Sequence, residues 1–151
     1  MKYLNYKYYF LIESFKDTIK IGNEDNLKVD YTFIDNLGNK YLVEFKNIKN
    51  TNTYSISYFV WDIDISNWSV SKIIKSNPWR IVKTVFGDIF SDFVNRKKNC
   101  TKIKFTGLSK DLQKELVSQR TKMYIRFLER NPLQGFRVTN YGNDITLQKI
   151  N

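Results

Sequence analysis

The stretch Asn77-Pro-Trp-Arg-Ile-Val-Lys-Thr-Val-Phe-Gly-Asp-Ile-Phe-Ser-Asp-Phe-Val94 carries the clearest structural signal in the chain. The Asn77 side chain can accept a hydrogen bond from a free backbone N–H at a helix start, and Pro78 suits the first helical position, where no N–H is needed. Apolar residues then recur at helical spacing, at Val82, Val85, Phe86, Ile89, Phe90 and Phe93. These features predict a helix from about 78 to 95.

The residues upstream of this helix predict strands. Val29-Asp-Tyr-Thr-Phe-Ile34 and Lys40-Tyr-Leu-Val-Glu-Phe45 flank Asp35-Asn-Leu-Gly-Asn39, a short connection rich in residues that tolerate positive φ, and so form a hairpin pattern. A third strand is expected from about Thr53 to Ile65. The apolar register changes near Phe59-Val60-Trp61, which predicts a bulge or a doubly buried stretch there.

The sequence at the chain start is compatible with two kinds of secondary structure. Residues 3–21 fit both a helical stripe and a strand, and Gly22-Asn-Glu-Asp-Asn26 is expected to be a loop.

Downstream of the helix, a short strand is expected at Lys102-Ile-Lys-Phe-Thr106, ending at Gly107. A second helical stretch, irregular around Val117-Ser118, is marked by Leu108, Leu112, Leu116, Met123 and Phe127. Gly135-Phe-Arg-Val-Thr139 and Ile145-Thr-Leu-Gln-Lys149 then form a closing hairpin. The order predicts one α+β domain over residues 1–151, with two main helices on a mixed, mainly antiparallel sheet.

Composition limits the class of protein. With 151 residues, of which 42% are hydrophobic, the chain is long enough for one core and too short for two ordinary domains. It has no apolar run of about 18 residues, and its first residues lack the apolar centre of a signal peptide. We expect a soluble protein made in a cytoplasm. The absence of alanine and the abundance of Lys, Asn and Ile indicate an AT-rich coding genome.

Cysteine and histidine usage excludes several kinds of site. Cys100 is the only cysteine and the chain has no histidine, so an internal disulfide and the histidine-based catalytic triads are impossible. No metal site is expected, because zinc and related sites usually rely on these two residue types. The basic loop before Cys100 could lower the pKa of its thiol, but a bystander thiol is the commoner case.

The positive charge is concentrated in one part of the chain. The formal net charge is +10, and residues 72–130 hold 15 Lys or Arg against 5 Asp or Glu. Such asymmetry favours a polyanionic partner, although a solvated basic helix face gives the same count. If residues 119–130 are helical, Lys122, Arg126 and Arg130 recur every four residues as one basic ridge, with Arg120 nearby. Trp68 and Trp79 are candidate aromatic contacts, because aromatic rings beside cations can stack single-stranded bases.

The order of elements from about Val29 to Lys149 resembles the second part of the GNAT N-acyltransferase fold. The stretch Gln119-Arg-Thr-Lys-Met-Tyr-Ile-Arg-Phe-Leu-Glu-Arg130, followed by Gly135-Phe136, is similar to that family's late helix with an internal tyrosine and a following Gly-Phe. The resemblance implies acetyl-CoA as cofactor, Tyr124 as the general acid and Glu44 as a candidate general base. Segments around residues 60–64, 77–80 and 124 also resemble small uncharacterised bacteriophage proteins.

One part of the GNAT pattern is missing. That family holds the coenzyme A pyrophosphate on backbone N–H groups of a glycine-containing loop at a helix N-terminus, where donors converge and no side chain blocks the anion. The equivalent segment, Ser69-Val-Ser-Lys-Ile-Ile-Lys-Ser-Asn-Pro78, has no glycine, and Pro78 removes one donor. An anion here would depend on the helix dipole, Lys72, Lys75 and Arg80.

Asp62 and Asp64 are two residues apart, so on a regular strand both carboxylates would face the same side. Two ligands rarely suffice for a cation, and a polar strand edge is the more common reading.

From these patterns we expect a non-catalytic phage-type structural or interaction protein, a component of a virion or an assembly, found in the host cytoplasm or incorporated into the virion. It would bind partners through aromatic and basic surfaces. Two alternatives remain open: a sequence-tolerant single-stranded nucleic-acid binding protein, and a GNAT-type acyltransferase that uses acetyl-CoA.

Overall fold

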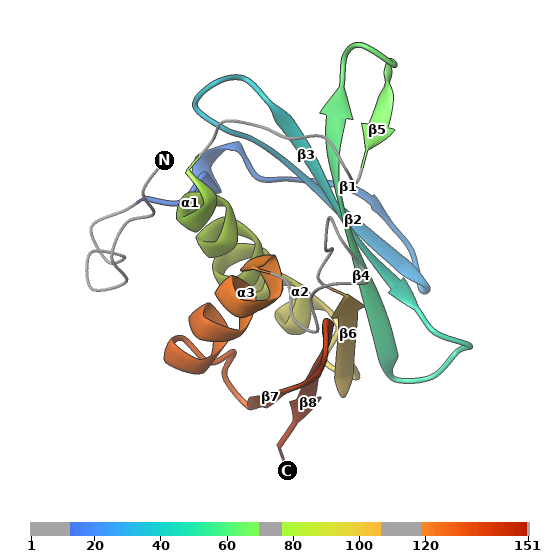
Figure 1. Cartoon of the computed structure of the whole chain (residues 1–151). Coiled ribbons are helices and arrows are strands. Elements are labelled where there is room, and N and C mark those ends of the chain that lie inside the picture. The colour runs from blue at the N-terminus through green and yellow to red at the C-terminus, as the bar shows by residue number, and fades with distance from the viewer. Residues whose placement is uncertain (1–12, 70–76, 107–118, 151) are drawn as a thin grey trace.

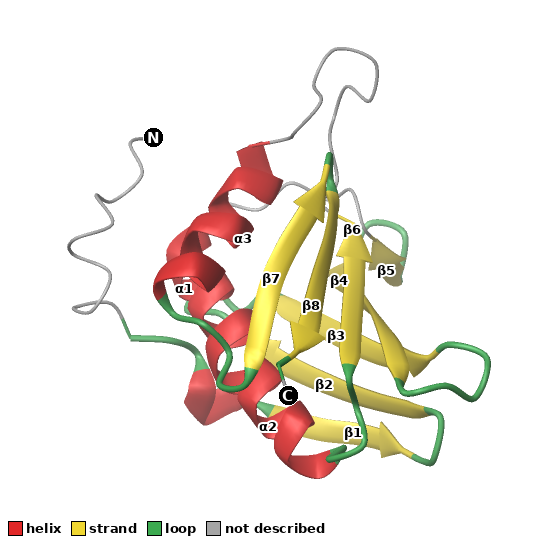
Figure 2. Cartoon of the chain, turned by 90° about the horizontal axis from the view of Figure 1, so that it is seen from below, coloured by secondary structure: helices red, strands yellow, loops and turns green. Residues whose placement is uncertain are grey.

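The structure is a computed structural model that describes residues 13–69, 77–106 and 119–150. Its strands form one sheet in the order β1-β2-β3-β4-β6-β8-β7, and β5 pairs with β4 off this path (Figures 1 and 2). The strands are β1 (Lys20–Glu24), β2 (Lys28–Ile34), β3 (Lys40–Asn47), β4 (Thr53–Asp62), β5 (Asn67–Ser69), β6 (Lys102–Thr106), β7 (Phe136–Tyr141) and β8 (Asp144–Lys149). Among the strands that the structure describes, only β4 and β6 pair in parallel, and the other pairs are antiparallel. The predicted α+β class and mixed sheet are confirmed.

The predicted first helix is confirmed, with an unexpected centre. It consists of α1 (Pro78–Val82), a π-helical segment η3 (Lys83–Ile89) and α2 (Phe90–Arg96) in direct succession. The Asn77 carboxamide oxygen accepts from the Trp79 N–H at 3.0 Å, and Pro78 occupies the first turn. Apolar spacing does not distinguish α from π geometry, so the π segment was not predictable from the stripe. The other helices within the described ranges are the 3₁₀ turn η2 (Lys16–Thr18) and α3 (Gln119–Arg130).

The β2–β3 hairpin is also confirmed. Its register pairs Val29 with Phe45 and Ile34 with Lys40 without a shift. Asp35 fixes the turn: its carboxylate accepts from the backbone N–H groups of Leu37 and Asn39, from the Asn39 side chain and from the Tyr41 hydroxyl. Gly38 has φ +85°, a conformation that glycine adopts without strain.

Three expectations for the strands are wrong. Lys20–Glu24 forms the edge strand β1, although residues 22–26 were expected to be a loop; every residue of β1 is exposed, so the strand carries no apolar alternation. The third strand ends at Asp62 and returns through a turn into β5, so Ile63 and Ile65 are 74% and 60% exposed. No bulge is present against β3, because the register is continuous from Tyr54 to Val60.

The sheet buries one face against the helices. Aromatic side chains from both layers meet there, and the rings of Phe45 and Phe93 stack with centroids 3.9 Å apart. Tyr31, Phe33, Tyr41, Phe45, Phe90 and Phe93 are all inaccessible to solvent. No described helix covers the opposite face of the sheet, which we call the open face (Figure 2).

Several expectations lie outside the described residues. These are residues 3–12 at the chain start, Gly107, and the beginning of the second helix at Leu108, Leu112 and Leu116. Among the helices of the described ranges, none is long and apolar enough to span a membrane.

Candidate functional site

The sheet opens between its two parallel strands. β4 pairs with β6 only at Thr53, Tyr54 and Ser55. Farther along, residues 60–62 of β4 pair with β5 on the same edge. Residues 56–59 lie between these two ladders and pair only with β3 among the described strands.

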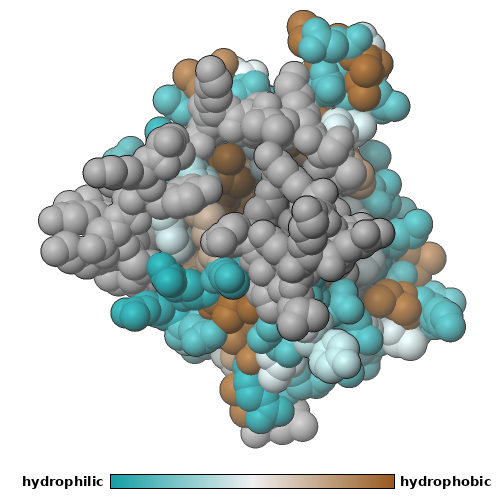
Figure 3. Space-filling model, in the orientation of Figure 1, coloured by the Kyte–Doolittle hydropathy of each residue, from teal (hydrophilic) through white to brown (hydrophobic). Residues whose placement is uncertain are grey.

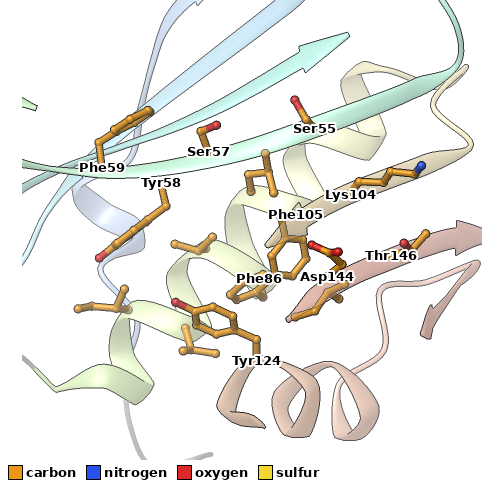
Figure 4. A pocket seen from close by; sticks show the side chains of 15 residues that line it. Ser55, Ser57, Tyr58, Phe59, Phe86, Lys104, Phe105, Tyr124, Asp144 and Thr146 are labelled. Carbon is orange, nitrogen blue, oxygen red and sulfur yellow. The ribbon is translucent and has the colours of Figure 1, made fainter. Parts of the chain in front are cut away.

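A cavity of about 580 Å³ occupies this opening, and we call it the β4–β6 slot (Figure 4). Its walls come from the edge of β4, the α1–η3 helical segment, β6, α3 and β8. The lining residues are Ser55, Ile56, Ser57, Tyr58, Phe59, Ile81, Val82, Val85, Phe86, Lys104, Phe105, Tyr124, Asp144, Ile145 and Thr146.

The two sides of the slot differ in chemistry. Tyr58 projects from β4 toward the helices, whereas Ser55, Ser57 and Phe59 project from its other side (Figure 4). The helix side is aromatic, because the Phe86 ring lies 4.9 Å from that of Tyr124 and 5.2 Å from that of Phe105. The side toward the open face is more polar, with Lys104, Asp144 and Thr146 among its residues. The slot thus suits an extended ligand with an apolar body and polar groups.

The structure separates the two residues that the GNAT resemblance singles out. Tyr124 lies on the slot wall, on α3. Glu44 lies on the open face, where its carboxylate is 3.2 Å from the Lys28 ammonium, and it does not line the slot. Glu44 faces Asp30 and Ser57 across the neighbouring strands.

Asp30 is an ionisable residue that the sequence analysis missed. It is only 7% exposed, its Oδ2 lies 3.6 Å from the Lys28 ammonium, and its Oδ1 has no hydrogen-bond partner among the described residues. Burial raises its pKa, and the Lys28 charge only partly offsets this effect. Asp30 alternates with buried apolar residues of β2, a pattern typical of an exposed side chain.

The expected anion site at the helix start is only partly described. Lys72 and Lys75 lie outside the described residues. The Arg80 Nε donates to the Glu13 carbonyl at 2.8 Å, and the Arg80 guanidinium lies 4.1 Å from the centre of the Phe15 ring. Arg80 therefore holds the N-terminal segment against the helix.

The candidate aromatic contacts have different surroundings. Trp79 is 5% exposed, so its ring belongs to the core and is not offered to a partner. Trp68 is half-buried, and its ring meets that of Trp61 edge-on at 5.3 Å.

The basic ridge of α3 is present on the surface. Lys122, Arg126 and Arg130 are exposed, whereas the side chain of Arg120 lies outside the described part of the structure.

The remaining candidates have structural roles. Asp64 lies in the turn after β4 rather than on a strand, and its N–H donates to the Asp62 carboxylate at 3.0 Å. Cys100 is 2% exposed, and burial raises the pKa of its thiol to about 11, so the basic loop does not activate it. The described ranges contain no group of three or more side chains arranged to hold a metal ion.

Comparison with known proteins gave no match: no protein-family model, curated protein or solved structure is significantly similar to the chain.

Proposed function

We propose that the β4–β6 slot binds an acyl thioester of the coenzyme A class and that the chain acts as an N-acyltransferase. The observation that carries the proposal is the cavity between two parallel strands, with aromatic rings on its helix side and polar side chains toward the open face. The pantetheine arm of such a thioester is a narrow chain with amides and methylene groups. Its amides can bond to the polar side chains of the slot, and its methylene groups fit the apolar wall.

The resemblance of the element order to GNAT enzymes supports this choice of ligand. The slot lies between β4, which precedes β5 and the first main helix, and β6, which follows that helix, so both walls belong to the segment that carries the resemblance. The missing glycine loop leaves the phosphates without the family's usual cradle, which predicts weaker coenzyme binding than a complete loop gives.

Tyr124 has a defined role in this proposal. When an amine attacks the thioester carbonyl, the C–S bond breaks and the departing sulfur needs a proton. The phenol of Tyr124, on the slot wall, supplies that proton. The attacking nitrogen releases one proton to water as the amide forms, and the phenolate of Tyr124 takes up a proton from water, so the phenol is restored at the end of the turnover. Tyr124→Phe should therefore retain thioester binding and slow acyl transfer by about 10²-fold to 10⁴-fold.

The experiment is a thermal-shift titration with acetyl-CoA. At a concentration about 100 times Kd, binding adds about 2.7 kcal/mol, which is a rise in Tm of about 5–10 °C for a chain of this size. Ser57→Trp should abolish the shift by filling the slot, because Ser57 lines it. Ser91→Trp is the matched control, since Ser91 is exposed on α2. A parent protein with no saturable shift, or a Ser57→Trp variant that binds as tightly as the parent, would refute the proposal.

A second candidate is a protein-binding role, and the hairpin of β4 and β5 favours it. Its tip exposes Ile63 and Ile65, and Trp61 behind them is 38% exposed. Apolar atoms are visible at this tip, at the upper right of Figure 3. Exposed isoleucines of this kind are typical of contact surfaces. The double variant Ile63→Ser/Ile65→Ser should lose co-purifying virion proteins that the parent retains, and equal recovery by both would exclude this hairpin as the contact.

A further inference from the structure

The open face of the sheet carries cations without ion pairs. Lys46 on β3, Lys102 and Lys104 on β6, and Arg137 on β7 alternate with residues buried on the helix side, so they project from the open face. Among the described residues, none of their side chains forms an ion pair or a hydrogen bond. In contrast, Lys28 on the same face is held by Asp30 and Glu44.

The strand register places these cations in two adjacent rows. One row runs from Lys46 through Ser55 to Lys104 and on to Thr146. The next row runs from Lys102 through Gln148 to Arg137. Neighbouring strands are about 4.8 Å apart and same-face residues along a strand about 7 Å apart, so the cations extend over about 19 Å from β3 to β7. This arrangement matches an extended chain of anions better than a single phosphate.

Aromatic residues lie on the same face. Phe59 projects from the same side of β4 as Ser55 and Ser57 (Figure 4), and Trp61 follows two residues later. Phe59 is half-buried and Trp61 is 38% exposed, so both offer part of their ring surface to solvent. Cations beside partly exposed rings are the combination that holds a phosphate backbone and stacks unpaired bases.

We propose that the open face binds single-stranded nucleic acid, with phosphates along the two cationic rows and bases against Phe59 and Trp61. The breadth of the open face favours single-stranded over double-stranded nucleic acid as the ligand. The grooves of a duplex admit a helix or a two-stranded ribbon, whereas a single strand can spread its bases over a sheet. This function does not depend on thioester binding in the slot.

The basic ridge of α3 is a weaker candidate for the same ligand. Lys122, Arg126 and Arg130 are exposed there, but Glu129 is exposed beside them. The aromatic residues of α3 face inward: Phe127 is buried, and the ring of Tyr124 packs against Phe86. The ridge therefore offers charge without a stacking surface.

The two basic surfaces can be compared with matched variants. Fluorescence anisotropy with a labelled 20-nucleotide single strand, without coenzyme, would be measured at several salt concentrations. The sheet variant is Lys46→Gln/Lys102→Gln/Arg137→Gln, and the control is Lys122→Gln/Arg126→Gln/Arg130→Gln, which removes the same charge from α3. Each phosphate contact contributes about 0.7 to the slope of log K against log salt, so the sheet variant should lower the slope by about 2 and the control should leave it unchanged.

A third variant tests stacking. Phe59→Ala should weaken binding by about 5-fold or more at every salt concentration without changing the salt slope, because stacking contributes about 1–3 kcal/mol per base. Circular dichroism of each variant would show that the sheet is retained. Equal loss in the sheet variant and its control would mean that only net charge matters and would overturn the proposal. Absent oligonucleotide binding at low salt, or binding only to anionic lipid vesicles, would also overturn it.

Discussion

Replacing Asp35 by alanine should remove much of the stability of the β2–β3 hairpin. Asp35 is 6% exposed and accepts four hydrogen bonds, at 2.7–2.9 Å. The variant removes the hydrogen bond that the buried Tyr41 hydroxyl donates to the carboxylate, and a hydrogen bond to a charged group contributes about 1.5–3 kcal/mol. Leu37 is exposed and Asn39 half-buried, so water can replace part of their bonds. We expect a total loss of about 3–5 kcal/mol, because hydrogen bonds to a charged group are among the stronger ones.

The effect should depend on pH in a defined way. Burial opposes ionisation of Asp35, but the hydrogen bonds from Tyr41, Asn39 and the turn outweigh it and lower its pKa. A folded pKa below the unfolded value of about 3.9 stabilises the fold above that pH, and the stabilisation is lost as the pH falls through the folded pKa. The difference between parent and variant should therefore be constant from about pH 8 to pH 5 and shrink below about pH 4.

Urea denaturation followed by circular dichroism would measure this difference. Asn36→Ala is the control, because Asn36 is exposed in the same turn and should cost less than about 0.5 kcal/mol. A loss below about 1 kcal/mol for Asp35→Ala, or a loss equal to that of Asn36→Ala, would show that the carboxylate does not hold the turn.

Burial raises the pKa of two other groups, Asp30 and Cys100, and each shift gives a prediction. Asp30→Asn should be as stable as the parent or more stable at pH 7, because burial raises the pKa of Asp30 and so penalises its charged form. The gain in stability should vanish below about pH 4, where the carboxyl is protonated in the folded and the unfolded state. A clear loss of stability at pH 7, measured by urea denaturation, would contradict this prediction. Cys100 should react slowly with iodoacetamide at pH 8 and much faster in urea, because burial raises its pKa to about 11; rapid labelling of the native protein, detected by mass spectrometry, would show that the thiol is accessible.

The sequence predicted the elements whose signals are local. Asn77 and Pro78 mark a helix start through cap chemistry, and the Asp35–Asn39 turn sits between two alternating strands, so both elements were recognisable from their own residues. β1 was missed because it is an edge strand with no buried side chain. The end of β4 was missed because Ile63 and Ile65 continue the apolar alternation although they lie in an exposed turn.

The candidate site was less predictable, because it arises where strand pairing stops. The amino-acid pattern of β4 does not indicate that its pairing with β6 ends at Ser55. The slot therefore becomes visible only once the strands are assembled into the sheet. Tyr124 was identified through a family resemblance and does lie on the slot wall. The cations of the open face come from three strands that are distant in sequence, so they form no cluster until the strand order is known.

The three-residue ladder between β4 and β6 also has a consequence for how the chain folds. β1 to β4 form a meander of neighbours in sequence, with short loop closures, whereas β6 and β4 are separated in sequence by β5 and the first main helix. We expect the meander to fold early and the parallel ladder to form last. Strands that are distant in sequence lose loop-closure entropy before their contacts can form, which makes their pairing slow. The walls of the β4–β6 slot would then meet only at the end of folding.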